Sequence, residues 1–167
     1  GHGQGHGQGR RLFTLISYGF VHYNLTHLLW NISFGAVFSK VVYPALGAFN
    51  WALVFVAGLV GGAIFHFLTS DNQMGIIGCS AGVAAWLGAG VLFTIKKIPM
   101  PAPFNNRGFT IFFIVFFIGF NFIGAVVNNI FTTTPISNYG HLGGLLFGFV
   151  TAQLLIWPRE KKLRRGS

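Results

Sequence analysis

A serine framed by small residues begins one of the long apolar segments of this chain. Residues 78–82 read Gly-Cys-Ser-Ala-Gly, and Ser80 is the hydroxyl-bearing residue among them. A serine hydroxyl is a weak nucleophile until a neighbouring base takes its proton. With such a base beside it, Ser80 has the chemistry to attack a carbonyl carbon and form an acyl-enzyme.

Histidines begin two further apolar segments. His141 lies within the glycine-rich residues 140–144, and His27 precedes Asn31 by four positions, so these two share one helix face. Polar and ionisable side chains are costly inside a membrane and by default indicate function. His141 is therefore the candidate base for Ser80. His27, Asn31 and a backbone N–H at the serine are candidate donors to an oxyanion.

The chain has only two acidic residues, and they decide between a catalytic triad and a dyad. Glu160 follows His141 by 19 residues, or ~28 Å along a helix, which is too far to orient the histidine ring. Asp71 lies in a loop on the same side as Ser80 and stays open as a partner. The sequence therefore favours a Ser80–His141 dyad.

The composition is typical of a membrane protein. Of the 167 residues, 53% are hydrophobic and 8% are charged, whereas about 25% of the residues of a soluble domain are charged. The net charge of +9 lies mostly in short basic runs that flank apolar segments. No amphipathic basic face accompanies these runs, so binding to nucleic acid is not expected. The single cysteine, Cys79, allows no intrachain disulfide.

Five apolar segments approach the ~20 residues of helix that cross a bilayer. They cover approximately residues 23–42, 51–69, 79–95, 109–127 and 139–157. These segments predict an all-α fold, a polytopic membrane helical bundle with five transmembrane helices within residues 13–158. Residues 1–12 are expected to be a flexible Gly/His/Gln-rich tail, and residues 159–167 a basic cytoplasmic tail.

Helix-breaking and turn-forming residues separate the five segments. The first segment is expected to end at Pro44 and Gly47, and the last at Pro158. The other breaks are the polar residues 69–73, the loop with Pro99, Pro101 and Pro103, and residues 132–135.

Basic residues predict the orientation of the bundle, because Lys and Arg gather in cytoplasmic loops. Here Lys40 lies at the first interhelical turn and other basic residues follow the third and fifth segments, whereas residues 70–78 and 128–138 contain none. Five alternating spans then place the C-terminus in the cytoplasm and the start of the first span outside. Arg10 and Arg11 lie outside in this arrangement, against the charge rule. We therefore expect either a preceding span that this sequence lacks or a translocated tail.

The same orientation predicts that the candidate site residues meet. The first, third and fifth spans all run inward, so their polar residues lie within roughly 10 Å of the outer surface. Gly140, Gly144 and Gly148 recur every four residues, a spacing that lets membrane helices approach closely. A multi-pass membrane protein with its active site toward the outer side is therefore expected.

Three motifs, in this order along the chain, resemble those of the rhomboid intramembrane serine proteases. Residues 22–31 resemble the family's His-x4-His-x3-Asn segment, residues 78–81 its Gly-x-Ser-x motif, and His141 with Gly144 and Gly148 its His-x2-Gly-x3-Gly helix. The resemblance covers about residues 13–157. It implies an endopeptidase that cleaves transmembrane protein substrates in the lipid bilayer without a metal or other cofactor.

The resemblance also implies roles for individual residues. Ser80 is the nucleophile and His141 its base. His27 and Asn31 bind the oxyanion together with the backbone N–H of the serine.

Three further features acquire a meaning by the same resemblance. Gly78 lies beside the active site, and His22 lies at its outer mouth. The Phe-rich fourth segment corresponds to the helix beside the lateral substrate entry, or alternatively is a lipid-facing surface. Its phenylalanines are Phe109, Phe112, Phe113, Phe116, Phe117, Phe120 and Phe122.

The chain departs from the family's pattern at several positions. The family's usual first helix is missing, and Phe13-Thr14 stands where a Trp-Arg pair is frequent. Tyr43 lies near the position of a common structural Glu. Ala84 stands where an aromatic residue often stacks on the base, and Trp86 is a candidate replacement for it.

Two other functions stay open from the sequence. A catalytically inactive relative that binds membrane clients is favoured by the missing helix and by Ala84, but the presence of both Ser80 and His141 opposes it. A histidine-lined channel or transporter would use His22, His27, His66 and His141. Such a protein would more often carry acidic residues at the midplane, and this chain has none there. In the protease hypothesis, His66 packs or hydrogen-bonds near the outer end of the second segment.

Overall fold

The computed structural model describes residues 13–69, 76–131 and 137–165, and these residues form helices and loops without a strand. A helical turn at residues 13–17 leads into a 3-10 helix, η1. The order is η1 (Tyr18–Phe20), α2 (Leu25–Thr69), α3 (Ser80–Lys96), α4 (Arg107–Phe131) and α5 (Asn138–Arg165). The predicted all-helical membrane bundle is therefore confirmed. The expected tail at residues 1–12 and the loop with Asp71 lie outside the described residues.

The long helix α2 contains the first two predicted spans, with a break at Gly47. Gly47 has φ 79° and ψ 169°, a conformation that glycine adopts without the steric cost of a Cβ. The break gives the apolar segments Leu25–Leu46 and Ala48–Thr69, each 22 residues long. The side chain of Asn50 donates to the Leu46 carbonyl across the break at 3.1 Å.

The first apolar span ends at Leu46, just before Gly47, and the last ends at Pro158, as predicted, but neither proline ends its helix. Pro44 lies inside α2, and Pro158 lies inside α5, which continues to Arg165. Each proline removes one backbone donor, while the residues around it keep the helical conformation. After Pro158, the residues are mainly Glu, Lys, Leu and Arg, which favour a helix.

The helices α3 and α5, which pack with both halves of α2, contact each other through small residues. A side chain at Gly88 would meet the backbone of Leu145, and one at Gly148 would meet the backbone of Ala85. Glycine at these positions therefore lets α3 and α5 touch backbone to backbone, as the four-residue spacing of small residues predicts.

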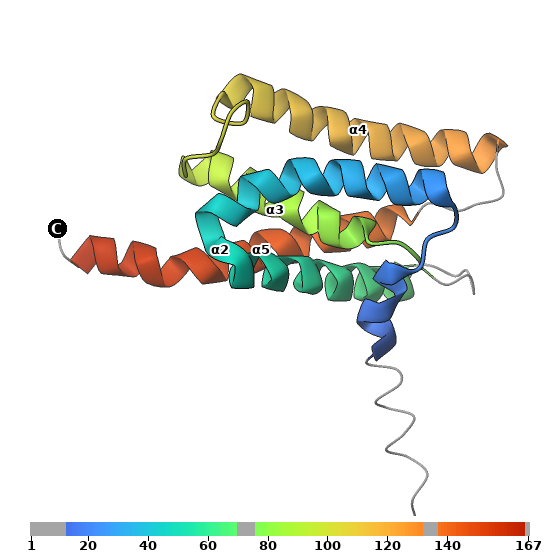
Figure 1. The fold of residues 1–167 in the computed structure, drawn as a ribbon, viewed down its shortest axis with the longest axis horizontal. Helices are drawn as coiled ribbons and strands as arrows, with labels where there is room; N and C mark the ends of the chain where they lie inside the picture. Colours follow the sequence, from blue (N-terminus) through green and yellow to red (C-terminus); the bar gives the residue numbers. More distant parts are fainter. Residues whose placement is uncertain (1–12, 70–75, 132–136, 166–167) are drawn as a thin grey trace, which may run out of the picture.

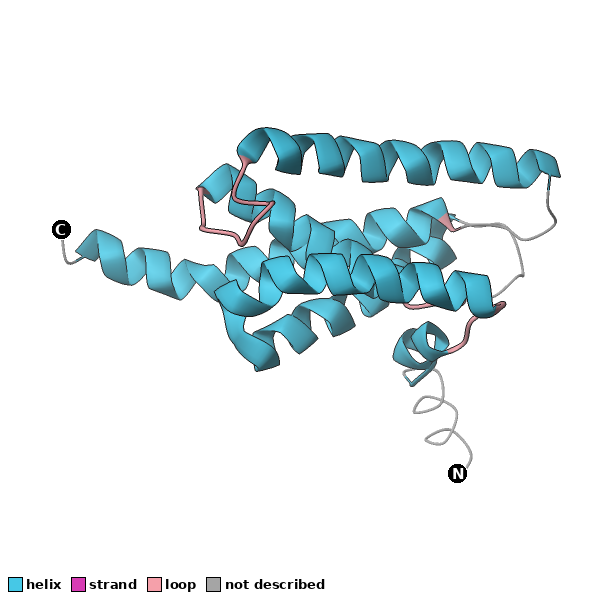
Figure 2. Ribbon diagram, turned by 45° about the horizontal axis from the view of Figure 1, so that its top comes forward, coloured by secondary structure: helices cyan, strands magenta, loops and turns pink. Residues whose placement is uncertain are grey.

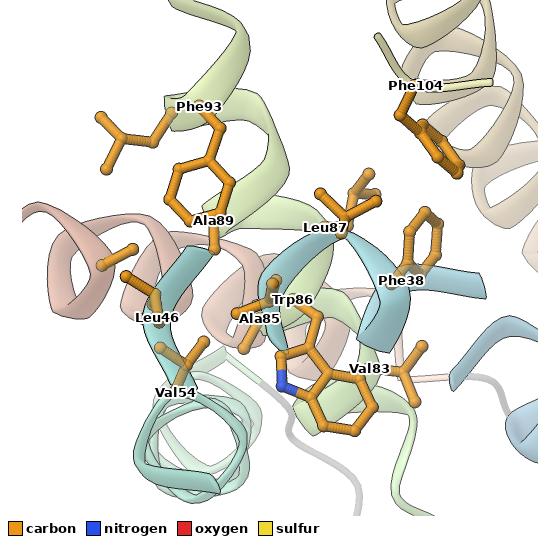
Figure 3. Packing of buried hydrophobic residues seen from close by; sticks show 14 of the residues in the cluster. Phe38, Leu46, Val54, Val83, Ala85, Trp86, Leu87, Ala89, Phe93 and Phe104 are labelled. Carbon is orange, nitrogen blue, oxygen red and sulfur yellow. The ribbon is translucent and has the colours of Figure 1, made fainter. Parts of the chain in front are cut away.

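A cluster of buried hydrophobic side chains fills the interior of the bundle around these glycine contacts (Figure 3). The Trp86 ring stacks on Trp51 with 4.7 Å between centroids, and its N–H donates to the Trp51 carbonyl at 3.1 Å. Trp51 in turn donates to the Ser39 hydroxyl at 3.0 Å. These bonds give both indole N–H groups a partner inside the apolar interior.

The helix α4 lies on the outside of the bundle, beside the first half of α2 (Figure 1, Figure 2). Phe113 and Phe117 make edge contacts with Phe38, at centroid distances of 5.6 and 5.2 Å. Phe112 and Phe116 are 65% and 48% exposed. The Phe-rich segment therefore has an inner row that packs on α2 and an outer row that faces away. The side chains of Phe120 and Phe122 lie outside the described part.

The helices alternate in direction, so α2, α3 and α5 all begin at the same end of the bundle (Figure 1). The helix α4 begins at the opposite end of the bundle, and α5 ends there. The polar residues that begin α2, α3 and α5 are thereby brought to one end.

Candidate active site

Ser80 and His141 are in direct contact across two helices. Ser80 is the first residue of α3, and His141 lies in the first turn of α5. His141 Nε2 is 2.7 Å from Ser80 Oγ, which is within hydrogen-bond reach for a base and a nucleophile. With the ring proton on Nδ1, the Nε2 lone pair accepts the serine O–H. Proton transfer to His141 would then leave the serine oxygen as a nucleophile.

A glycine contact brings these two residues together. A side chain at Gly144 would meet the backbone carbonyl of Ala81, the residue after Ser80. Gly144 lies one turn after His141 on α5. The close approach of the two backbones at this point places the first turn of α5 beside the first turn of α3, within reach of a hydrogen bond.

No third group orients the His141 ring within the described part of the chain. The buried Nδ1 atom of His141 has no hydrogen-bond partner there. Glu160 lies on α5 itself, 19 residues further along, so it is ~28 Å away along the helix axis. The described geometry is therefore that of a dyad, and Asp71 lies outside the described residues.

Gly78 brings His27 and Asn31 toward the serine loop. Its φ of 97° is in the left-handed region that favours glycine. A Cβ on Gly78 would lie 2.8 Å from His27 Nε2 and 3.4 Å from Asn31 Nδ2. Glycine is thus required twice here, for backbone conformation and for space. The two side chains from α2 converge on the backbone two residues before Ser80.

The hydrogen bonds around His27 determine which of its two ring nitrogens carries the proton. The Asn24 side chain caps α2 by accepting the His27 backbone N–H at 2.8 Å. The Tyr23 backbone N–H donates to His27 Nδ1 at 3.5 Å. Because Nδ1 accepts a hydrogen bond, the proton of the neutral ring lies on Nε2. The nitrogen beside Gly78 is therefore a donor.

The Asn31 amide is an unsatisfied buried donor. The residue is 6% exposed, and its Nδ2 atom has no hydrogen-bond partner among the residues that the structure describes. A buried polar group without a partner costs free energy and calls for an explanation. A ligand oxygen bound beside Gly78 would supply the missing acceptor.

His22 lies next to the same loop. Its Nε2 atom is 3.5 Å from the Cys79 sulfur, and its ring contacts His27 edge-on at 5.2 Å. Cys79 is a free, half-buried thiol. The predicted residues His22, His27, Asn31 and Gly78 therefore surround the loop that leads into Ser80.

Trp86 does not contact the candidate base. Its ring packs on Trp51 and on Phe55. Ala84 is fully buried in α3. Within the described residues, no aromatic ring stacks on His141, so the sequence-based candidate replacement for the missing aromatic is wrong.

Tyr18 supports the site and was not predicted from the sequence. Its carbonyl accepts the backbone N–H of Gly78 at 3.1 Å, and its hydroxyl donates to the Leu59 carbonyl at 2.7 Å. Burial raises the pKa of the Tyr18 phenol, so the hydroxyl keeps its proton and remains a donor. Tyr18 thus ties the Gly78 loop to α2. No motif singles it out, because both of its partners are backbone groups.

Comparison with known protein families gives one match. Residues 9–158 of the chain match the Rhomboid domain. No curated protein matches the sequence. The match spans most of the chain and includes every residue of the candidate site.

Proposed function

This chain belongs to the rhomboid family of membrane proteins, and we propose that it is an intramembrane serine endopeptidase. The observation that carries this proposal is the 2.7 Å contact between Ser80 Oγ and His141 Nε2. In the proposed reaction, Ser80 is the nucleophile and His141 is the general base. The substrate is a transmembrane protein, reached within the lipid bilayer.

The first half of the proposed reaction forms an acyl-enzyme. His141 Nε2 takes the proton of the Ser80 hydroxyl as its oxygen attacks the carbonyl carbon of the scissile bond. The carbonyl oxygen becomes an oxyanion. When the tetrahedral intermediate collapses, the C–N bond breaks and His141 returns the proton to the leaving amine. Water then attacks the acyl carbon as His141 takes its proton. His141 returns this proton to the Ser80 oxygen as the acyl–oxygen bond breaks.

Three donors are proposed to stabilise the oxyanion. They are the Ser80 backbone N–H, the Nε2–H of His27 and the Asn31 amide. The Nδ2 of Asn31 supports this assignment, because it is a buried donor beside Gly78 without a partner among the described residues. Losing one such donor typically costs about 2.7–4 kcal/mol of transition-state stabilisation.

The active site is proposed to open toward the outer side of the membrane, with the C-terminus in the cytoplasm. The bundle end where α3 and α5 begin carries the site. At the other end, Lys96 ends α3, Lys97 follows it and Arg107 begins α4. Basic loops stay in the cytoplasm, which supports this orientation.

The test is cleavage of a transmembrane substrate by the purified protein in proteoliposomes. The parent is expected to produce a cut within the substrate's membrane segment, and Ser80→Ala and His141→Ala are expected to produce none. Substrate binding by the parent without any cleavage would instead favour a client-binding relative. Cleavage that survives Ser80→Ala would exclude the proposed nucleophile.

A further inference from the structure

His66 is a buried histidine at the end of α2 that the proposed chemistry does not use. It is 9% exposed and lies three residues before α2 ends at Thr69. Its Nδ1 atom is 2.8 Å from the Ser137 hydroxyl, 71 positions further along the chain. This contact joins the end of α2 to the start of α5.

Ser137 is the N-cap of α5, the helix that carries His141. The Ser137 hydroxyl oxygen accepts the Gly140 backbone N–H at 3.0 Å. The Ser137 carbonyl accepts the His141 backbone N–H at 3.1 Å. Ser137 therefore closes the helical turn in which His141 is the last residue. Any shift of Ser137 moves the backbone of His141 with it.

The His141 ring needs an external means of positioning. In a triad, a carboxylate on Nδ1 holds the histidine in the required orientation. Here Nδ1 has no partner in the described part of the chain, so the ring direction depends on where the backbone is held. After His141, the contact of Gly144 with Ala81 holds the backbone of α5. Before His141, the cap at Ser137 holds this backbone.

We propose that His66 is a positioning residue for His141, acting through Ser137. This inference rests on the proposed protease function. The Ser137 oxygen accepts the Gly140 N–H, and with the His66 ring proton on Nε2 the Ser137 hydroxyl donates to His66 Nδ1. The resulting chain of hydrogen bonds fixes the N-cap hydroxyl in the rotamer that closes the first turn of α5. His66 thereby acts, through Ser137, in place of the third group that the described part of the chain does not supply.

His66 affects the placement of the base, His141, and not the binding of the substrate. His66 contacts the cap of α5 through Nδ1, and Ser137 is not one of the proposed reacting residues. Removing His66 should lower kcat and leave KM unchanged, because the nucleophile and the oxyanion donors stay in place. A misplacement of about 1 Å at a catalytic group can cost on the order of 100-fold in rate.

The experiment compares His66→Leu, His66→Asn, Ser137→Ala and the double variant His66→Leu/Ser137→Ala in the proteoliposome assay. His66→Leu and Ser137→Ala should each lower kcat by about 10- to 100-fold with KM within twofold. The double variant should lose no more than the worse single variant, because both changes break one chain of hydrogen bonds. His66→Asn keeps a side-chain acceptor near the position of Nδ1 and should recover most of kcat.

The control is Thr110→Val, which removes a buried hydroxyl that donates to the Phe104 carbonyl at 2.8 Å. Thr110 lies at the start of α4, at the opposite end of the bundle. Its loss should lower the thermal midpoint and leave kcat unchanged. His66→Leu activity within twofold of the parent would overturn the proposal. So would equal kcat losses in His66→Leu and His66→Asn that track their thermal midpoints, because that result marks a purely structural role.

A second readout does not depend on activity. In protein labelled with ¹³C-histidine, the ring signal of His141 should shift in His66→Leu and Ser137→Ala and stay near its parent position in His66→Asn and Thr110→Val. If the parent shows no Ser80-dependent cleavage, the proposed function fails and this measurement alone decides the positioning role. An unchanged His141 signal in His66→Leu would overturn it.

Discussion

Gly144 lies so close to Ala81 that any side chain at position 144 would meet the Ala81 backbone carbonyl. On α5 this contact lies one turn after His141, and on α3 it lies at the residue directly after Ser80. The backbone approach and the side-chain contact are therefore parts of one arrangement. The glycine spacing that resembles a packing motif is also what puts a base within 2.7 Å of a nucleophile.

Gly144→Ala should separate α3 from α5 and disable the dyad. The new methyl group has to displace backbone rather than a flexible side chain, so we expect about 1–3 kcal/mol of destabilisation. Cleavage should fall by on the order of 100-fold, because the base moves relative to Ser80. The matched control is Gly119→Ala on α4, where a Cβ meets nothing within 4 Å. If both variants cleave at the parent rate, the contact does not position the dyad.

Gly78→Ala and Gly47→Ala should separate backbone strain from crowding at the site. Both glycines have positive φ, 97° and 79° respectively, so both substitutions should cost about 1–3 kcal/mol of stability. Only the methyl group at position 78 would meet the His27 ring, because the space around Gly47 is open. Activity corrected for the folded fraction should fall in Gly78→Ala alone. An equal loss in both variants would contradict the role given to Gly78.

Asn31→Ala should lower activity without lowering stability. The Asn31 amide nitrogen donates to no described residue, so its removal relieves a buried unsatisfied donor. We expect kcat to fall by about 100- to 1,000-fold if the amide binds the oxyanion, and the thermal midpoint to stay equal or rise. Asn50→Ala is the control, because that amide donates to the Leu46 carbonyl. It should be less stable than the parent and retain kcat.

Tyr18→Phe should weaken the protein and change its response to alkaline pH. The variant leaves the Leu59 carbonyl without its donor, at a cost of about 1–3 kcal/mol. Because burial raises the pKa of Tyr18 in the folded state, the phenol ionises first in unfolded chains. The stability it contributes is complete below the unfolded pKa of ~10 and decreases as the pH rises above it. Unfolding midpoints measured from pH 8 to 11 should therefore decline more steeply in the parent than in Tyr18→Phe. Parallel declines would contradict the buried, neutral state of this side chain.

The sequence predicts the helices and the partners Ser80 and His141 because both depend on short-range patterns. Apolar length predicts the spans, and the alternation of spans predicts that α3 and α5 begin at the same end. Neither pattern predicts that His141 Nε2 lies within hydrogen-bond distance of Ser80 Oγ. This distance depends on the glycine contacts between the two helices, whose register only the folded structure gives.

The supporting residues Tyr18, His66 and Ser137 could not be predicted in these roles. The partners of Tyr18 are backbone groups, and His66 and Ser137 are separated by 71 positions. Such contacts leave no periodic or local signal. Pro44 and Pro158 lie inside their helices because the surrounding residues sustain the helical conformation across each proline, although the apolar spans end near them.

The most direct test of the central claim is the site of labelling by a fluorophosphonate probe, located by mass spectrometry of the protein in membranes. An activated serine beside a base is expected to form one stable adduct, on Ser80. Labelling should disappear in Ser80→Ala, fall to background in His141→Ala and persist in Thr110→Val. Absence of any adduct on Ser80 in the folded parent, or labelling that is undiminished in His141→Ala, would contradict a Ser80–His141 dyad.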